Sequence, residues 1–390
     1  MVKAFQFSRL PFIHFSTGKI KVLPGLIKRY GKTILLVTAG ESFVKSPYAE
    51  TLSEALLREG IKYLHFVVSG EPSPEIIDSV SEKIRNEAVN AVVAVGGGSV
   101  LDAGKAVSAM YGVKGSVREY LEGVGTWEHP GTKLPFIALP TTSGTGSEAT
   151  KNAVISEIGK NGFKKSLRHD NFVPDIAIVD PELTLSCPPD ITAASGMDCF
   201  TQLTESFLSG NASEYTDALA WEGLKAVKSS LVQTCHNGDD ITARTGMSFA
   251  ALTSGICLAN AGLGVVHGFA SSAGGMFNIP HGVVCGTLMA PANAITLREL
   301  RRGVNNPEIT NKYVRLGKLF IETRGKPDDY YMDGFVEYLL KLSDDLNLPR
   351  LDKYGIKEED IEPICRITEL KNNPVKLNLE DLMEILRSRL

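Results

Sequence analysis

The sequence has few cysteines, little excess of either charge and no long apolar run. Lys and Arg number 41 against 45 Asp and Glu in 390 residues, a net charge of -4, so nothing indicates a nucleic-acid or anionic-membrane partner. The six cysteines show no CxxC pair and no framework spacing, which favours a reduced, cytoplasmic setting over a disulfide scaffold. No apolar run approaches the ~20 residues needed to span a bilayer, and the N-terminus does not resemble a signal peptide. We therefore expect a soluble, cytoplasmic, globular protein.

The first half of the chain alternates short β-branched runs with amphipathic helical segments. Strands that are separated by helices are joined by crossovers, so this alternation predicts a doubly wound parallel sheet. The predicted strands are Lys32–Thr38, Tyr63–Ser69, Asn90–Val95, Leu134–Leu139 and Asp175–Val179, and the predicted helices between them include Ala49–Glu59 and Glu75–Asn86.

Two glycine-rich turns follow predicted strands, at the sheet edge where doubly wound folds bind their ligands. The first, GGGSVLDAGK (Gly96–Lys105), lets the backbone approach a pyrophosphate closely and offers the free N–H groups of a helix start. Leu101 and Ser99 stand where the Rossmann and Walker patterns, respectively, need a glycine. The second, PTTSGTGSEAT (Pro140–Thr150), combines glycines with hydroxyls that suit phosphate or ribose. Each alone is also compatible with an ordinary turn, but together they predict a dinucleotide site.

The second half of the chain has helical periodicity. The segment Cys187–Asp190 breaks the α/β pattern. We therefore expect an α/β dinucleotide-binding domain over residues 1–187 and an all-helical domain over residues 188–390, with the charged tail Asp352–Leu390 as a solvated helical edge. The predicted helices are Thr192–Phe207, Tyr215–Val232, Ile241–Ala261, Asn311–Glu322 and Tyr330–Leu346.

The stretch Ala261–Gly282 (AGLGVVHGFASSAGGMFNIPHG) places His267 and His281 in a glycine-rich, largely apolar context. Upstream, Asp198 and Gln202 lie one turn apart on the same face of a predicted helix. Taken singly, such a histidine is more often a hydrogen-bonded core or turn residue. Taken together, two imidazoles, a carboxylate and a carboxamide are a candidate ligand set for a divalent metal.

Several of these motifs, in this order, resemble the iron-containing, group III alcohol dehydrogenase family. The motifs are GGGSVLDAGK, PTTSGTGSEAT, VDPELT (Val179–Thr184), ASGMD (Ala194–Asp198) and HGFASSAGGMFNIPHG. The resemblance covers nearly the whole chain and implies a dinucleotide-binding α/β domain followed by an all-helical domain, with coenzyme and metal in the cleft between them. It also implies a homodimer or larger homo-oligomer.

The resemblance further implies which residues contact the coenzyme. They are Gly97, Gly98, Ser99 and Asp102 for the pyrophosphate, Thr141, Thr142 and Thr150 for the adenosine and nicotinamide ends, and Lys164 or Lys165 for the nicotinamide ribose.

The choice between NAD and NADP depends on the end of the first predicted strand. NAD enzymes usually place a carboxylate there, which repels the added phosphate of NADP. This chain has Ala39 and Gly40 instead, and Ser42 and Lys45 are placed to contact a phosphate. Glu41 argues for NAD if it points inward. We expect NADP or NAD, with NADP preferred.

The metal site departs from the family pattern of three histidines and one aspartate around iron or zinc. Gln202 and Ser271 stand where histidines are usual. A carboxamide is a weaker ligand than an imidazole, so Gln202 either ligates weakly or hydrogen-bonds to a ligand. Asp198, His267 and His281 still form a two-histidine, one-carboxylate set.

The expected function is hydride transfer between a small alcohol or aldehyde and NAD(P), assisted by a divalent metal and by His267, His281, Asp198 and Ser271. The proton then leaves through hydroxyls or water. Three alternatives stay open: a metal-independent reductase resembling maleylacetate reductases, a lyase resembling dehydroquinate synthase, and a non-catalytic dinucleotide sensor.

Overall fold

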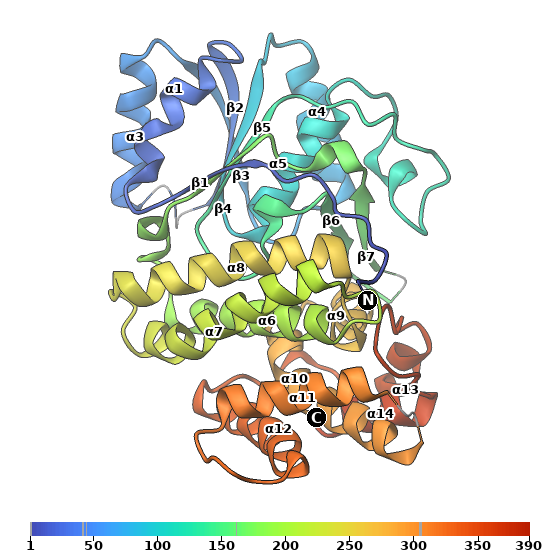
Figure 1. Cartoon of the computed structure of the whole chain (residues 1–390). Helices are drawn as coiled ribbons and strands as arrows, with labels where there is room; N and C mark the ends of the chain where they lie inside the picture. The colour runs from blue at the N-terminus through green and yellow to red at the C-terminus, as the bar shows by residue number, and fades with distance from the viewer. Residues whose placement is uncertain (1, 41–42, 44, 161, 304–305) are drawn as a thin grey trace.

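The computed structural model describes residues 2–40, 43, 45–160, 162–303 and 306–390. An α/β part lies above a helical part (Figure 1). The α/β part contains a six-stranded, wholly parallel sheet in the order β1-β8-β5-β4-β2-β3, which confirms the predicted fold class. Its strands are β1 (Phe12–Phe15), β2 (Thr33–Ala39), β3 (Lys62–Val68), β4 (Ala91–Gly96), β5 (Phe136–Pro140) and β8 (Ile176–Val179); β1 was not predicted.

Helices cover both faces of this sheet, because the central strands point apolar side chains towards each face. Ile34 and Leu36 of β2 pack with α1 (Leu23–Ile27) and α3 (Pro47–Arg58), whereas Leu35 and Val37 enter the cluster on the other face. That second cluster includes the helices α4 (Pro74–Arg85) and α5 (Gly98–Met110). The near-continuous apolar character of β2 and β4 is typical of parallel strands buried on two faces.

The strand order reverses between β2 and β4, the sheet's topological switch point. A ligand of an open α/β sheet binds outside the carboxyl ends of the strands at such a point. Ala39 ends β2 and Gly96 ends β4, so the chain places its candidate coenzyme residues where the topology creates a binding site.

An antiparallel hairpin absent from the predictions connects the two parts of the molecule. It consists of β6 (Asn152–Glu157) and β7 (Phe163–Arg168). Its first strand packs on α5 and its second on α9 of the helical part. Lys164 and Lys165 therefore lie on a strand between the two domains.

The helical part begins with α6, three residues before the predicted start at Thr192. Pro188 and Pro189 favour this early start, since proline suits the first turn of a helix. The helices are α6 (Pro189–Leu208), α7 (Glu214–His236), α8 (Ile241–Ala261), α9 (Val265–Met276), α10 (His281–Arg302), α11 (Pro307–Phe320), α12 (Asp328–Asp345), α13 (Glu358–Arg366) and α14 (Leu379–Arg387).

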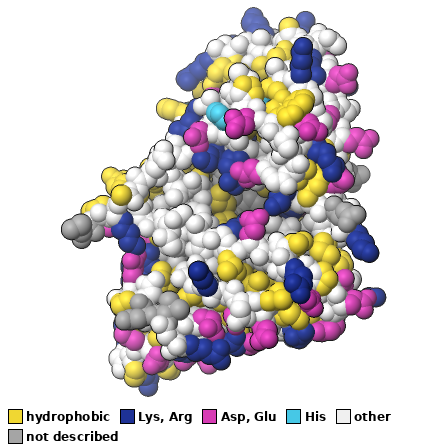
Figure 2. Space-filling model, turned by 90° about the vertical axis from the view of Figure 1, so that its right-hand side faces the viewer, with side chains coloured by type: hydrophobic (Ala, Val, Ile, Leu, Met, Phe, Trp, Pro, Cys, Tyr) yellow, Lys and Arg dark blue, Asp and Glu magenta, His cyan; other side chains and the backbone are white. Residues whose placement is uncertain are grey.

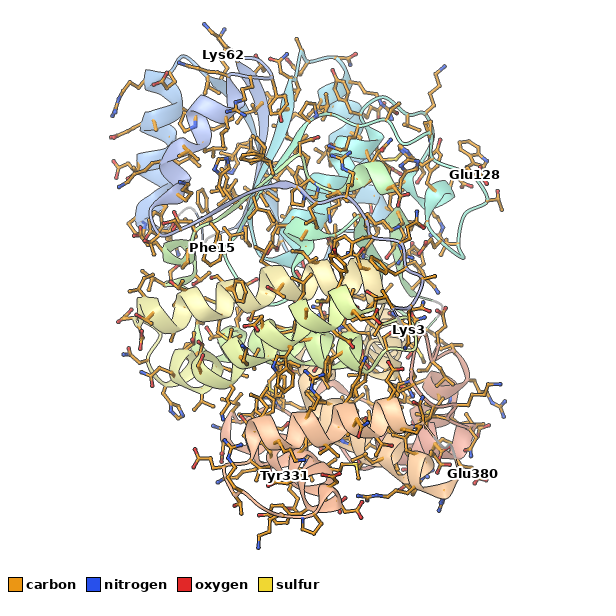
Figure 3. All side chains as sticks on the ribbon, in the orientation of Figure 1. Lys3, Phe15, Lys62, Glu128, Tyr331 and Glu380 are labelled. Carbon is orange, nitrogen blue, oxygen red and sulfur yellow. The ribbon has the colours of Figure 1, made fainter. Side chains whose placement is uncertain are left out.

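The N-terminal segment runs from the helical part to the sheet. The Nζ of Lys3 lies 2.7 Å from Oε1 of Glu308, beside the helices (Figure 3). The amide of Ser8 donates to Oδ1 of Asn260 (2.6 Å), and β1 then joins the sheet edge beside β8. This segment therefore ties the two parts together.

Among the described residues, no single helix combines the length and hydropathy of a membrane span; α8 and α9 do so only as a pair that bends by 98°. On the face shown in Figure 2, basic and acidic side chains are interspersed.

The expectation that the tail Asp352–Leu390 is a solvated edge was wrong. Its helices α13 and α14 are amphipathic, and their apolar faces complete the core of the helical domain. Ile364 and Ile385 are fully buried there. Charged residues of the tail lie on the outer faces of these helices, and their abundance conceals the amphipathic pattern in the sequence.

Replacing Ile385 with Ala tests this packing. We expect a loss of about 2–5 kcal/mol in the free energy of unfolding, because the change opens a cavity in the core. Ile367→Ala, at a side chain that is 58% exposed, is the control and is expected to stay within about 0.5 kcal/mol. Urea unfolding measures both; equal, small effects would contradict a core role for the tail.

Candidate metal centre and coenzyme site

Three helices bring the predicted metal ligands to one point. Asp198 is buried in the middle of α6, His267 lies in the first turn of α9, and His281 is the first residue of α10. The start of α10 can approach α6 because Gly282 has no side chain: a Cβ there would lie 2.3 Å from the carbonyl oxygen of Ala194.

The distances among these side chains suit a shared metal ion. Nε2 of His267 lies 3.2 Å and Nε2 of His281 lies 3.7 Å from Oδ1 of Asp198. Cys285, one turn beyond His281 on α10, joins them, with its Sγ 3.6 Å from Nε2 of His267. One ligand atom from each of the four residues lies within 4.8 Å of every other.

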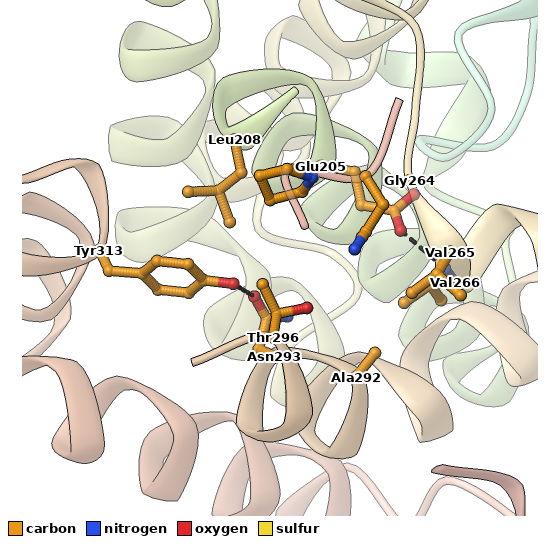
Figure 4. A pocket seen from close by; sticks show the side chains of 11 residues that line it. Glu205, Leu208, Gly264, Val265, Val266, Ala292, Asn293, Thr296 and Tyr313 are labelled. Atoms are coloured by element: carbon orange, nitrogen blue, oxygen red, sulfur yellow. Dashed lines mark hydrogen bonds between the residues drawn. The ribbon is translucent and has the colours of Figure 1, made fainter. Parts of the chain in front are cut away.

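A second carboxylate, Glu205, orients His267 from behind. Its Oε2 lies 2.6 Å from Nδ1 of His267, and its Oε1 accepts a hydrogen bond from the amide of Val266 (2.7 Å). This bond leaves Nε2 of His267 facing Asp198, the arrangement in which carboxylates orient metal-binding histidines. Figure 4 shows Glu205 beside a small pocket, with its bond to Val266 dashed.

The electrostatics of the cluster separate the two histidines. Burial opposes the charged form of His267, but Cys285, Asp198 and Glu205 outweigh it and raise the pKa of His267 well above its ordinary value. Burial of the ring and the nearby charge of Lys164 lower the pKa of His281 to about 4. The lowered pKa of His281 favours the neutral ring, which is the form that binds a metal.

Gln202 is 2% exposed and lies one turn beyond Asp198. Its amide nitrogen donates to the carbonyl of Gly144 (3.4 Å), and its Oε1 has no hydrogen-bond partner among the described residues. Nδ1 of His281 is likewise buried and unpartnered within the described part of the chain. Unsatisfied polar atoms of this kind are costly unless a ligand or water completes them, so the donor set fits a bound divalent metal.

Ser271 lies one turn beyond His267 on α9, as predicted. Its hydroxyl donates to the carbonyl oxygen of His267 (3.0 Å) and is partly exposed. It therefore lies beside the cluster with its proton directed to its own helix.

The two glycine-rich loops meet at the switch point. Gly97 precedes α5 and offers no side-chain cap to its first turn. A Cβ on Gly97 or Gly98 would lie 3.3 Å or 2.8 Å from Thr142 or Thr145, respectively. These glycines with Ser99 form a partly exposed helix start that suits a pyrophosphate, and Thr141 begins the facing loop with its amide bonded to Gly96 (3.0 Å).

Asp102 and Thr150, which the resemblance assigns to the coenzyme, belong to a buried network around Lys105. Ser147 donates its hydroxyl proton to Asp102 (2.5 Å). Nζ of Lys105 lies within hydrogen-bond distance of Ser147, Thr150 and Asn152. Burial lowers the pKa of Lys105 to about 8. The network fixes the second loop against α5.

The structure distinguishes the two candidate lysines. Lys164, 6% exposed in its side chain, pairs with Glu71, and its stem packs on Gly274 of α9 beside the metal cluster. Lys165 points the other way and pairs with Glu369 (3.2 Å) at the surface. Only Lys164 is directed towards the cluster.

At the end of β2, Ala39 pairs with Val68 in the sheet and brings no carboxylate to the coenzyme edge. Glu41 and Ser42, which are predicted to influence the choice between NAD and NADP, lie outside the described residues.

Sequence reasoning missed four residues at the site: Glu205, Cys285, Glu71 and Lys105. Two carried a signal. Glu205 follows Asp198 by seven residues and therefore shares its helix face, and Cys285 follows His281 by one turn. Glu71 reaches the site only through tertiary folding.

Comparison with known proteins identifies the family of this chain. Residues 11–181 match the family described as iron-containing alcohol dehydrogenase, and residues 192–390 match its C-terminal domain. The chain is 36% identical over 273 residues (70% of this chain, 68% of the relative) to long-chain-alcohol dehydrogenase 1 of Geobacillus thermodenitrificans. It is 30% identical over 383 residues (96% and 95%) to the NADPH-dependent butanol dehydrogenase of Clostridium saccharobutylicum.

Among solved structures, a 1,3-propanediol oxidoreductase superimposes with a TM-score of 0.88 at 27% identity, covering 100% of both chains. The sequence motifs, the two-part fold and these matches agree, and the chain belongs to the iron-containing alcohol dehydrogenase family.

Proposed function

We propose that this protein is a cytoplasmic NAD(P)-dependent alcohol dehydrogenase or aldehyde reductase that uses a divalent metal and a small alcohol or aldehyde. The convergence of Asp198, His267 and His281 beside Lys164 carries the proposal. Residues 1–187 bind the coenzyme and residues 188–390 supply the metal ligands. All six cysteines are free thiols, which favours a reducing compartment such as the cytoplasm.

The coenzyme binds along the carboxyl edge of the sheet. Gly97, Gly98 and Ser99 hold the pyrophosphate with the backbone N–H groups of the α5 start. The hydroxyls of Thr141 and Thr142 contact its ends, and Lys164 bonds the nicotinamide ribose. Asp102 and Thr150 do not contact the coenzyme; they hold the second glycine-rich loop in place through hydrogen bonds to Ser147 and Lys105.

Asp198, His267 and His281 would hold the metal. A divalent ion bound there would supply Lewis-acid polarisation of the substrate oxygen, the chemistry that hydride transfer to or from the carbon needs. Glu205 keeps His267 in the ligating tautomer. Asp198 and His267 are buried, which limits the access of bulk water, whereas the side chain of His281 is 27% exposed. Water carries the substrate proton, and the Ser271 hydroxyl oxygen, whose own proton is donated to the carbonyl of His267, is available as an acceptor.

A panel of small aldehydes tests the proposal against its rivals. Reduction with NADPH or NADH is measured after chelation and after adding back zinc or iron. We expect turnover that falls on chelation and returns with metal. Full activity without metal would indicate a metal-independent reductase instead. A lyase returns the hydride within each turnover, so turnover without net oxidation of NADPH or NADH would indicate a lyase.

His267→Ala removes a ligand from the cluster. We expect metal content per chain to fall at least about tenfold, since even outer partners of metal ligands cost 10–100-fold in affinity, and turnover to fall with it. His236→Ala, at the exposed end of α7, is the matched control. Unchanged metal content and turnover in His267→Ala would refute the assignment.

Lys164→Met tests the coenzyme contact. The loss of a charge-assisted hydrogen bond of about 1.5–3 kcal/mol predicts a dissociation constant for NADP(H) that is roughly 10–100-fold higher. Lys165→Met, which removes only the surface pair with Glu369, is expected to bind normally. Fluorescence titration measures both. Equal weakening in the two variants would argue against a specific role for Lys164.

Ala39→Asp tests the coenzyme preference. We expect NADPH affinity to fall by at least about tenfold through repulsion of the added phosphate, with NADH affinity unchanged or improved. The ratio of the two dissociation constants is the readout. If the ratio does not move, the adenosine ribose does not lie at the end of β2.

A further inference from the structure

We propose that the thiolate of Cys285 is the fourth protein ligand of the metal, so that the site is one aspartate, two histidines and one cysteine. This inference rests on the metal site proposed above and deepens it. With Cys285 as the fourth ligand, Gln202 does not bind the metal and zinc is the preferred ion.

Helix geometry delivers Cys285 to the cluster. His281 and Cys285 are one turn apart on α10 and project from the same face, as two ligands on one helix must. The close approach of α10 to α6 is set by Gly282 and also by Gly286, where a Cβ would lie 2.8 Å from Cβ of Met197. The thiol is therefore held against Asp198 and His267 by rigid helix packing.

Three of the separations among the four ligand atoms are close to those of a tetrahedral site. Zn–S and Zn–N or Zn–O bonds of about 2.3 and 2.0–2.1 Å place neighbouring ligand atoms roughly 3.3–3.6 Å apart. The separations in the structure are 3.6 Å from Sγ of Cys285 to Nε2 of His267, and 3.2 and 3.7 Å from Oδ1 of Asp198 to the two imidazoles. These atoms require only small shifts to surround one ion.

Charge balance favours the thiolate over the carboxamide. Asp198 and Cys285 are buried, and two anionic ligands neutralise a divalent ion where water cannot. Gln202 would bring no charge, and its amide is already turned towards Gly144. Its unpartnered Oε1 is then free to accept a hydrogen bond from a water or substrate hydroxyl at the ion.

A sulfur ligand changes which metal the site prefers. Thiolate is a soft donor that selects zinc over the harder ferrous ion. Catalytic zinc sites sometimes expand to five-coordination, and such an expansion is what a substrate oxygen would require at a site with four protein ligands. The cysteine therefore compensates for the histidine that Gln202 replaces, and it does so from a different helix.

Cobalt substitution tests the proposal directly. We expect the wild-type protein to bind one equivalent of Co²⁺ and to show an intense near-ultraviolet thiolate-to-cobalt charge-transfer band. Cys285→Ser should lose the band and bind zinc at least about tenfold more weakly. Cys257→Ser, at another fully buried cysteine in the same core, should keep both. Gln202→Ala should also keep the band.

X-ray absorption of the zinc-loaded wild type gives a test that needs no variant. A Zn–S shell near 2.3 Å is expected. Stoichiometric metal without a sulfur shell or charge-transfer band, or a band that survives in Cys285→Ser, would overturn the role of Cys285 while leaving the proposed function intact. A wild type that binds neither ion would instead overturn the metal site itself.

Discussion

The buried carboxylate of Asp198 is the group on which the rest of the site depends. A carboxylate that is 1% exposed costs several kcal/mol unless opposite charge or hydrogen-bond donors meet it. The nearby imidazoles of His267 and His281 lower its pKa against the effect of burial. The helices α6, α9 and α10 must therefore keep their mutual geometry, and a divalent ion at the same point would satisfy all of these groups at once.

In the proposed function, the two parts of the chain contribute complementary halves of one reaction site. The parallel sheet ends its strands at a switch point and presents glycines and hydroxyls there, while the helical domain presents the ligand cluster. The hairpin β6–β7 lies between them and carries Lys164 to the cluster. In the proposed function, this short antiparallel hairpin links the coenzyme site to the metal site, because β6 packs on α5 and β7 packs on α9.

Local periodicity predicted much of this arrangement. The β-branched runs gave the central strands, and the i, i+4 spacing placed Asp198 and Gln202 on one face of α6. The features that were not predicted depend on which helices and strands pack against one another in the folded chain. The hairpin lacks a strong alternating pattern, and Lys164 and Lys165 differ only in the face of β7 they occupy. Glu205 and Cys285 have the right spacing, but only the packing of three helices shows that they point at the same imidazole.

The proposed chemistry requires one metal ion among Asp198, His267 and His281. Anomalous diffraction from crystals grown with zinc, recorded on both sides of the zinc absorption edge, would locate that ion. We expect a single strong anomalous peak at about 2.0–2.3 Å from one atom of each of these side chains. A peak bound elsewhere on the chain, or none at this point in metal-saturated protein, would contradict it.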